Sequence, residues 1–338
     1  MKIAIIKLSS LGDIVVSLVF LPLFKKRHPN IHITWIVDTA FEGLLLDSNY
    51  IDFVLSLPLR KSKKNKKLIF SIYKDIRSLG EFDLVLDLQG LLKSALIGKL
   101  LKTKNFIGFD RASSRECISS IFYTKKVNID YSRHILERNF YIFKEAFNWS
   151  DSFNLELLEE REGALLPSIE SSIEELNIEA NNALFILEAS KKEKQYPLES
   201  FYKVALGLKK FGIKKIYLIW NKEEKEIKEL AARDNIFHVL PHLSLTQIKA
   251  LLTKIQLVIG GDTGITHLAW ALKRKSITIY GNTPIERFIL EGENHISISK
   301  FKYKKIMKND FSICDIESSE IINAALKLLK KENENENT

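Results

Sequence analysis

The chain has 338 residues, of which 46% are hydrophobic and 28% charged, a balance that excludes disordered and fibrous proteins. This length exceeds what one hydrophobic core usually organises, so we expect two domains. The formal net charge of +9 favours anionic partners, whether nucleic acid, anionic lipid or a phosphorylated substrate, without choosing among them.

No stretch predicts a membrane span or a signal peptide. The longest apolar run, residues 14–24, contains Ser17 and Pro22 and is far shorter than the ~20 residues that a membrane helix needs. Met1-Lys2-Ile3 enters a strand pattern at once, without a cleavage site. Cys117 and Cys314 lack metal-ligand spacing and are too few to crosslink such a chain, which is typical of a reducing cytoplasm.

The first half alternates strands with helices. Short apolar strands are predicted at residues 2–6, 31–37, 52–57, 83–88 and 105–109. Helical periodicity is found at residues 13–27, 67–79, 91–101 and 133–147. Strands that alternate with helices predict right-handed crossovers and a mostly parallel sheet.

The pattern weakens between Asn148 and Asn182 and then restarts, so we expect an N-terminal domain of residues 1–160 and a C-terminal domain of residues 161–315. The second half predicts strands at 183–187, 214–220, 236–240, 256–260 and 276–280, and helices at 198–211, 222–232, 245–254 and 265–272. A last helix, 316–331, is expected to pack back on the N-terminal domain, and 332–338 to be a disordered tail.

The fold class is therefore α/β, with two Rossmann-like doubly wound domains that face a central cleft and bind ligands at the carboxyl ends of their strands. A Gly-x-Gly-x-x-Gly fingerprint after the first strand is absent, which argues against a dehydrogenase.

The most informative stretch is residues 258–270, where an apolar strand enters a glycine-rich turn and then a helix. Unpaired N–H groups and the positive dipole end of that helix favour a phosphate. Gly260, Gly261 and Gly264 allow a sharp turn, and Asp262 or Thr263 can cap the helix. His267 would face the same site. On pattern alone, a capped helix after a buried strand explains these residues equally well.

The run Gly261-Asp262-Thr263-Gly264-Ile265-Thr266-His267-Leu268-Ala269 resembles the nucleotide-sugar signature of the bacterial heptosyltransferases, glycosyltransferase family 9. Further matches lie at strand-to-helix junctions in both halves. The resemblance implies a GT-B fold and an inverting transfer of heptose from ADP-heptose, with Asp262, Thr263, Gly264 and His267 binding the donor.

A second match is the first loop, Lys7-Leu8-Ser9-Ser10-Leu11-Gly12-Asp13. A carboxylate at a helix start is by itself an ordinary complement to the dipole. In the family a similar loop supplies the general base, so the resemblance implies that Asp13 takes the proton of the acceptor hydroxyl. Lys7 and Ser10 are the implied acceptor-binding residues of this loop.

Departure of the nucleoside diphosphate needs positive charge. Many glycosyltransferases use a metal held by Asp-x-Asp, but this chain contains no such motif, so we expect no metal and no cofactor. The family has a lysine before an aromatic-proline pair, which implies that Lys194, ahead of Tyr196-Pro197, is catalytic and binds the donor. Of the two hydroxyl residues of that loop only Ser190 is present, since the other position is Ala189.

The donor's ribose is held in the family by a glutamate after a Trp-Gly pair. Here Asn221 replaces that glycine after Trp220, and the spacer is shorter, so Glu223 and Glu224 compete for the role. We prefer Glu223, although both also suit the first turn of a helix.

The anionic acceptor is expected to meet residues of the N-terminal domain. The segment Asp87-Leu88-Gln89-Gly90-Leu91-Leu92-Lys93-Ser94 resembles a family motif and contributes Gln89 and Gly90. Arg115 and Arg60 are candidates for carboxylates and phosphates, because an arginine fork binds both at two points. Lys64 belongs to the basic run 60–67, which is otherwise a solvated loop.

The first loop resembles the family's first heptosyltransferases, which add heptose to the Kdo of Kdo2-lipid A, more than the second ones. This implies a monomeric, cytoplasmic protein at the anionic inner leaflet of the inner membrane, steered there by residues 60–67. The alternatives are heptosyltransferase II or another GT-B transferase. A nucleic-acid-binding protein would also use the basic run, but no nucleic-acid module and no interleaved aromatics are present. A sugar-binding protein without activity would not need Asp13.

Overall fold

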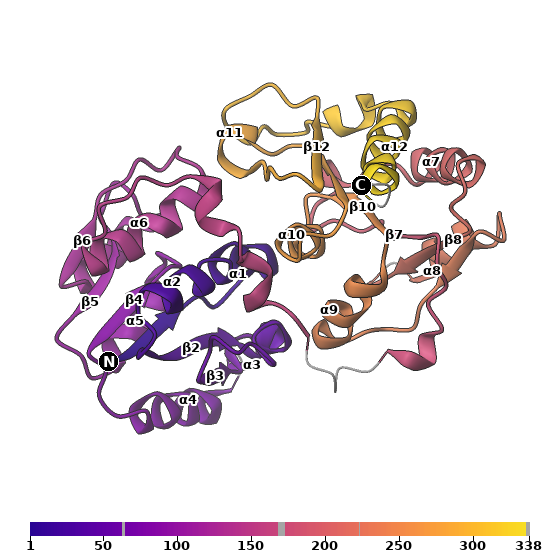
Figure 1. The fold of residues 1–338 in the computed structure, drawn as a ribbon. Helices are drawn as coiled ribbons and strands as arrows, with labels where there is room; N and C mark the ends of the chain where they lie inside the picture. Colours follow the sequence, from indigo (N-terminus) through magenta and orange to yellow (C-terminus); the bar gives the residue numbers. More distant parts are fainter. Residues whose placement is uncertain (63–64, 168–172, 223, 336–338) are drawn as a thin grey trace. The chain divides into compact units, whose positions relative to one another are not determined.

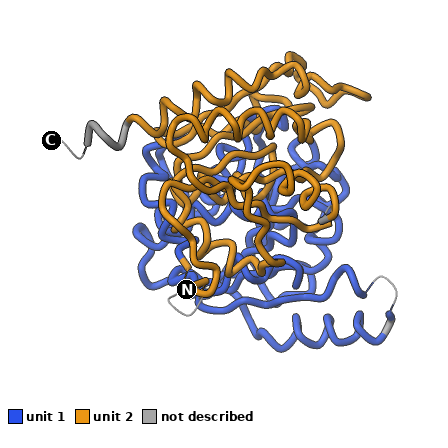
Figure 2. The backbone as a smooth tube through the Cα atoms, turned by 90° about the vertical axis from the view of Figure 1, so that its right-hand side faces the viewer, with its two compact units in different colours: residues 1–166 blue, residues 167–338 orange. Residues whose placement is uncertain are grey.

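The computed structural model describes residues 1–62, 65–167, 173–222 and 224–335. The chain forms two compact units, Met1–Leu166 and Pro167–Thr338, which are coloured separately in Figure 2. The division falls after Leu166, slightly later than the expected boundary after residue 160. It lies within the stretch 148–182, where the sequence pattern weakens.

Unit 1 is built on a fully parallel six-stranded sheet with the order β3-β2-β1-β4-β5-β6 (Figure 1). The strands are β1 (Lys2–Ile6), β2 (His32–Asp38), β3 (Phe53–Leu57), β4 (Leu84–Asp87), β5 (Phe106–Phe109) and β6 (Lys125–Val127). Because the order reverses direction beside β1, the loops after β1 and β4 flank the switch point where doubly wound sheets bind ligands.

Helices cover both faces of this sheet. They are α1 (Leu11–Leu18), α2 (Leu21–Arg27), α3 (Leu59–Ser62), α4 (Lys66–Ser78), α5 (Leu92–Leu100) and α6 (Ile135–Phe147), with the 3₁₀-helices η1 (Thr39–Leu44), η2 (Cys117–Phe122), η3 (Leu155–Leu158) and η4 (Arg161–Ala164). One face of the sheet packs against Leu59 of α3, Ile72 of α4 and Ile97 of α5. The helices α2 and α6 form an aromatic cluster instead, with the rings of Phe24 and Phe143 5.1 Å apart, and α1 packs against α6.

Unit 2 repeats the plan, with a parallel sheet of order β12-β11-β10-β7-β8-β9. Its strands are β7 (Asn182–Ile186), β8 (Lys215–Ile219), β9 (Phe237–Val239), β10 (Leu257–Gly261), β11 (Ser276–Tyr280) and β12 (His295–Ser299). Two doubly wound α/β units, as expected from the sequence, are therefore confirmed.

The helices of unit 2 also lie on both faces of its sheet. They are α7 (Leu198–Lys210), α8 (Glu224–Ala231), α9 (Leu245–Lys254), α10 (Gly264–Ala271), α11 (Ile285–Phe288) and α12 (Ser318–Asn335), with η5 (Glu174–Leu176), η6 (Lys192–Lys194) and η7 (Ser312–Asp315). The apolar side of α12, which was expected to meet the N-terminal domain, packs against α7, with Ile321, Ala325 and Leu328 in the core of unit 2.

Three local differences from the sequence prediction have physical reasons. The single helix expected at 13–27 is split into α1 and α2, because Pro22 is tolerated in a first helical turn but not inside a helix. The edge strands β6 and β12 were not predicted, and in β6 two exposed lysines mask the apolar signal. The last helix continues to Asn335, past the expected end at 331, and residues 336–338 lie outside the described chain.

In the part of the chain that the structure describes, no helix combines the length and apolar character needed to cross a membrane.

Candidate active site

The candidate base, Asp13, lies in the first turn of α1, directly after the loop that leaves β1. Its Oδ2 accepts hydrogen bonds from the backbone N–H and the hydroxyl of Ser10, at 3.1 and 2.7 Å. Asp13 therefore completes a capping box, and its half-buried side chain is held in one orientation. No other described residue donates to the carboxylate, so Oδ1 keeps its capacity to accept a proton.

The turn after β4 supports this loop. Gln89 Oε1 accepts from the N–H groups of Leu8 and Ser9, at 3.0 and 3.1 Å. Gln89 was predicted to bind the acceptor, but its oxygen is engaged with the β1 loop. Its geometry therefore fits a residue that positions the loop of Asp13.

Asp87, at the end of β4, organises the turn itself. The fully buried carboxylate accepts from the N–H groups of Gln89 and Gly90 and from the hydroxyls of Ser94 and Tyr123, at 2.8 to 3.1 Å. Burial raises the pKa of Asp87, although these four donors act against the shift. Gly90 has φ +66°, a left-handed conformation that glycine adopts without strain.

Lys7 does not reach solvent as expected for an acceptor-binding residue. It is 3% exposed, and its Nζ donates to the carbonyl of Leu88 at 2.7 Å. Burial lowers the pKa of Lys7, while the charges of Asp13 and Asp87 act to raise it. The lysine joins the loop after β1 to the loop after β4, and its burial does not support the prediction that it binds the acceptor.

Two predicted arginines lie at the same edge of the sheet. Arg60 of α3 is exposed and stands 4.9 Å from the ring of Phe41, with its Nε 3.9 Å from Asp38. Arg115 is exposed in the turn after β5, next to Glu116, whose carboxylate accepts from the N–H of Leu92 at 2.7 Å. The loop of Arg115 is thus fixed beside the Gly90 turn. Lys64 lies outside the described residues.

The donor-side candidates meet in unit 2, around Asp262 at the end of β10. Its Oδ2 accepts from Lys194 Nζ at 2.6 Å and from the hydroxyl of Thr283 at 2.8 Å. Its Oδ1 is 3.1 Å from Nε2 of His267. The structure therefore brings Lys194 to Asp262 and His267, although Lys194 lies 68 residues before Asp262 in the sequence.

The charge of this cluster is largely withdrawn from water, with the Asp262 side chain 8% exposed. Burial acts to raise the pKa of Asp262, but His267 and Lys194 outweigh it and hold the pKa well below its usual range. The buried Nδ1 of His267 has no hydrogen-bond partner among the described residues. A ligand that reached it could therefore satisfy a polar atom that the protein leaves unpaired.

The depressed pKa predicts how stability depends on pH. The contribution of ionised Asp262 should be complete above its ordinary pKa of 3.8 and be lost only as pH falls below that value, through the folded-state pKa. The unfolded chain has the ordinary pKa of 3.8 at this carboxyl. The difference in melting temperature between wild type and Asp262→Asn should therefore stay constant from neutral pH to about 4. A difference that already shrinks in weakly acidic buffer would contradict this assignment.

The start of α10 adjoins the cluster. Thr263 and Thr266 form a capping box, with Thr263 Oγ1 accepting from the N–H of Thr266 at 3.4 Å. Thr266 Oγ1 donates to the carbonyl of Gly261 at 2.8 Å, which fixes the turn. The N–H of Gly264 belongs to the first helical turn, where backbone donors have no intrahelical partner and favour an anion.

A pocket of about 240 Å³ opens beside Lys194. It is lined by Lys191, Glu193, Lys194, Asn282, Ile306, Met307, Lys308 and Asn309. The Asn282 side chain holds its wall, because it both donates to the carbonyl and accepts from the N–H of Met307, at 2.5 and 2.9 Å. Three lysines at this pocket favour an anionic ligand.

At one position in this wall, two backbone segments lie so close together that only glycine fits. A Cβ on Gly281 would lie 2.5 Å from the carbonyl oxygen of Glu193. The loop of Lys194 can therefore pack on the end of β11 only because residue 281 has no side chain.

The other predicted donor residues are less well placed. Ser190 is exposed in the loop after β7, and within the described part of the chain no hydrogen bond joins it to the cluster. Glu223 lies outside the described residues, and Glu224 begins α8. Glu188, which the sequence analysis did not single out, accepts from the N–H groups of Asn221 and Lys222, both at 3.0 Å. It holds together the loops after β7 and β8.

Three further residues of these turns, Asp87, Asn282 and Thr283, were not predicted as site residues. Asp87 ends β4, and Asn282 and Thr283 follow β11 after Gly281, so a polar residue at a strand's carboxyl end was the available signal. Among the residues described, no group of three or more His, Cys, Asp and Glu side chains is placed to hold a metal ion.

Known proteins resemble this chain in sequence and in fold. The profile of glycosyltransferase family 9 (heptosyltransferase) matches residues 69–312. A lipopolysaccharide heptosyltransferase 1 of Campylobacter coli is 37% identical over 98% of this chain and 98% of its own length.

Two solved structures resemble the whole chain. The E. coli heptosyltransferase WaaC with ADP has a TM-score of 0.80 and 26% identity, over 98% of this chain and all of that one. A family 9 glycosyltransferase from Veillonella parvula has a TM-score of 0.83 and 18% identity, covering 98% of this chain and 97% of that one.

Proposed function

Because this chain belongs to glycosyltransferase family 9 (heptosyltransferase), we propose that it transfers L-glycero-D-manno-heptose from ADP-heptose to the Kdo of Kdo2-lipid A, in synthesis of the lipopolysaccharide inner core. The enzyme is a glycosyltransferase. The name of the Campylobacter relative and the ADP in the E. coli structure support this choice of reaction and donor. In this role it works as a monomer at the cytoplasmic face of the inner membrane.

The observation that carries the proposal is the cluster of Lys194, Asp262 and His267 at the start of α10. A diphosphate at this place would meet the first-turn N–H groups of α10 and the Lys194 ammonium. Both are positive, and both are fixed before the ligand arrives. They suit the negative charge that grows on the ADP leaving group when the glycosidic bond breaks.

Asp262 has a different role in this account, because a buried carboxylate would repel a phosphate. It holds Lys194 and His267 in place through its two oxygens. His267 turns its unpaired Nδ1 away from that contact and can accept a hydrogen bond from a hydroxyl of the donor.

In unit 1, Asp13 acts as the general base. Ser10 holds Oδ2, so Oδ1 takes the proton from the acceptor hydroxyl as the hydroxyl oxygen attacks the anomeric carbon of heptose. A single attack opposite the leaving group inverts the configuration at that carbon. The bond to ADP breaks as the new glycosidic bond forms, and the proton stays on Asp13 until it passes to solvent.

We propose that the leaving group departs without a metal ion. Lys194 and the α10 dipole supply positive charge, and the sequence has no Asp-x-Asp. Treatment with EDTA should leave the rate of transfer unchanged. Loss of activity that magnesium restores would overturn this part of the mechanism.

Gln89 offers a test of how the base is positioned. Gln89→Ala removes the oxygen that accepts from Leu8 and Ser9, so the loop of Asp13 should lose its fixed geometry. We expect kcat to fall about tenfold to a hundredfold, with no change in the Kd for ADP because the donor cluster lies in unit 2. Gln89→Glu keeps the acceptor and should restore most of kcat. A weakened ADP affinity with unchanged kcat would contradict a positioning role.

The choice of acceptor tests the function itself. Release of ADP from ADP-heptose can be followed with Kdo2-lipid A, with the same acceptor already carrying one heptose, and with no acceptor. The proposal expects rapid release only with the first. Preference for the heptosylated acceptor would assign the chain to heptosyltransferase II, and turnover of another nucleotide-sugar would assign it to a different GT-B transferase.

A further inference from the structure

Several large apolar side chains are exposed together on one outer face of unit 1, whereas exposed residues of this kind are usually scattered singly. We name it the α4–α5 face. It is formed by α4, α5 and η2, which pack on the same side of the sheet and contact one another in the order α4, α5, η2. Its exposed apolar residues are Ile69, Phe70 and Tyr73 on α4, Leu96 on α5, and Ile118 and Ile121 on η2.

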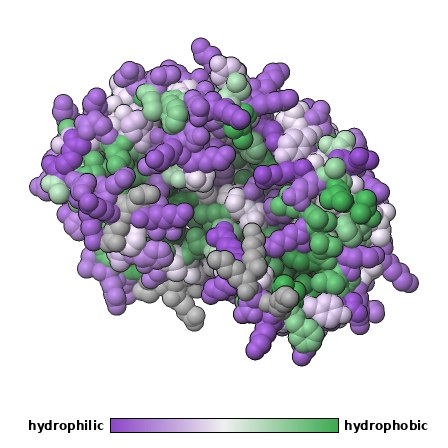
Figure 3. Space-filling model, turned by 180° about the vertical axis from the view of Figure 1, so that it is seen from behind, coloured by the Kyte–Doolittle hydropathy of each residue, from purple (hydrophilic) through white to green (hydrophobic). Residues whose placement is uncertain are grey.

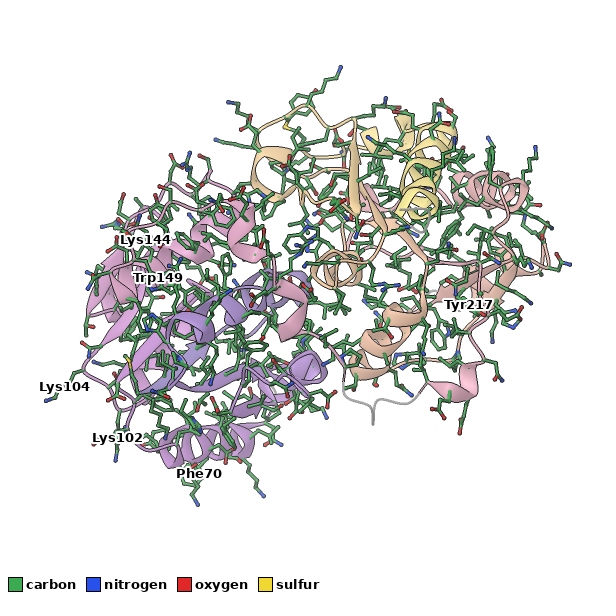
Figure 4. All side chains as sticks on the ribbon, in the orientation of Figure 1. Phe70, Lys102, Lys104, Lys144, Trp149 and Tyr217 are labelled. Carbon is green, nitrogen blue, oxygen red and sulfur yellow. The ribbon has the colours of Figure 1, made fainter. Side chains whose placement is uncertain are left out.

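The exposure of these side chains is large. Phe70 is 60% exposed and Ile121 67%, whereas Ile72 and Ile76 of the same α4 are buried against the sheet. Apolar residues thus occupy both sides of α4. Figure 4 shows Phe70 on the side of α4 that faces away from the sheet.

Basic side chains surround the apolar ones. Among the described residues, the same elements and the turn after α5 expose seven basic side chains, which are Lys67, Lys74, Arg77, Lys93, Lys99, Lys102 and Lys104. The exposed acidic residues described on and next to these elements are fewer, namely Asp75, Glu81 and Glu116. Arg77 donates to the carbonyl of Leu100 at 3.0 Å, which joins α4 to the end of α5. Figure 4 shows Lys102 and Lys104 at the turn that follows α5, and Figure 3 shows hydrophobic patches among hydrophilic side chains on unit 1.

We propose that the α4–α5 face docks on an anionic lipid bilayer. Exposed aromatic and aliphatic side chains enter the boundary between headgroups and acyl chains, while surrounding lysines contact anionic headgroups. A helix lying flat with this composition has the character of an interfacial anchor. The inference rests on the proposed function in one respect, since a lipid-borne acceptor gives the enzyme a reason to work at that surface.

Charge argues against the other occupants of such a face. A symmetric dimer would bring two basic faces together, and like charges across an interface oppose binding. A nucleic acid would use the lysines, but it gives no reason to expose Ile69, Leu96 and Ile121, which are aliphatic and cannot stack on bases as aromatic rings do.

The test uses the full chain and two vesicle types, one of phosphatidylethanolamine with phosphatidylglycerol and one of phosphatidylcholine alone. We expect the wild type to float with the anionic vesicles and to remain unbound with the neutral ones. The double variant Ile69→Ser with Phe70→Ser should lower the partition coefficient about tenfold or more. Each substitution removes an apolar side chain that would otherwise be buried in the bilayer. The variant Lys67→Gln with Lys74→Gln should lower binding in low salt.

Phe211→Ser is the matched control, because Phe211 is 58% exposed in unit 2 and lies outside the α4–α5 face. It should bind anionic vesicles as the wild type does. Equal binding by the Ile69/Phe70 variant, or no binding by the wild type, would overturn the proposal. So would a wild-type dimer that this variant converts to monomer, or a nucleic-acid complex that it loses.

Activity on an acyl-free Kdo acceptor separates this inference from the proposed function. The Ile69/Phe70 variant should transfer heptose to that acceptor at the wild-type rate, which also checks its folding. If the wild type binds vesicles but transfers nothing, the proposed function fails and the docking surface stands. If it transfers heptose without binding vesicles, the docking surface alone fails.

Discussion

Asp13→Asn is expected to lower kcat about 10²- to 10⁴-fold, the contribution typical of a general base. Asparagine keeps the size of the side chain and an oxygen that can accept from Ser10, so the first turn of α1 should stay intact. It cannot take a proton from the acceptor. The rate of heptose transfer at saturating substrates measures the effect.

Two controls make this result specific. ADP should bind Asp13→Asn with wild-type affinity, because the donor cluster lies in unit 2. Asp75→Asn changes an exposed aspartate on α4 and should leave kcat unchanged. Turnover of Asp13→Asn close to the wild-type rate would remove Asp13 as the base, and would leave open a role in the capping box alone.

Lys194→Met should lower kcat/KM about 10²- to 10³-fold, as expected when one preorganised positive group is removed from a developing anion. Methionine keeps much of the length of the side chain and none of its charge. The site also loses the ammonium group that a diphosphate would meet beside α10, so we expect weaker binding of ADP as well. Transfer kinetics and calorimetric titration with ADP measure the two effects separately.

Lys192→Met is the matched control, since Lys192 is an exposed lysine of the same loop and does not line the pocket beside Lys194. It should retain the wild-type kcat/KM. Equal losses in both variants would mean that the loop supplies only diffuse positive charge. An unchanged rate in Lys194→Met would exclude a role in leaving-group stabilisation.

Much of the fold could be predicted from the sequence because buried parallel strands are short, almost continuous apolar runs. β1, α9 and β11 begin and end at the predicted residues, Lys2–Ile6, Leu245–Lys254 and Ser276–Tyr280. Strand β6 could not be predicted, because at the sheet's edge its Lys125-Lys126-Val127 buries a single residue and so lacks the apolar run.

The position of a site residue could be predicted where its contacts are with residues close to it in the sequence. Thr263, one of the two residues expected to cap α10, is its cap, and Asp13 lies in the first turn of α1. Contacts between distant segments were not predictable. Nothing local in the sequence says that Gln89 accepts from Leu8, because this contact depends on β1 and β4 being neighbours in the sheet.

Lys7 illustrates the same limit. A lysine in a loop beside a base is expected to face an anionic substrate, but the structure turns it inward to the carbonyl of Leu88. Its backbone bonds to Trp35 and Ile36 of β2, and its Nζ bonds to Leu88 after β4, so its burial follows from how these strands are arranged. Only the order of the strands in the sheet could have revealed this.

The most direct measurement is the mass of Kdo2-lipid A after incubation with the wild-type protein and a panel of nucleotide-sugars. The account predicts a gain of one heptose residue with ADP-heptose, and no gain with the other donors or with Asp13→Asn. An unchanged acceptor mass with ADP-heptose, or a gain from a different donor, would contradict it.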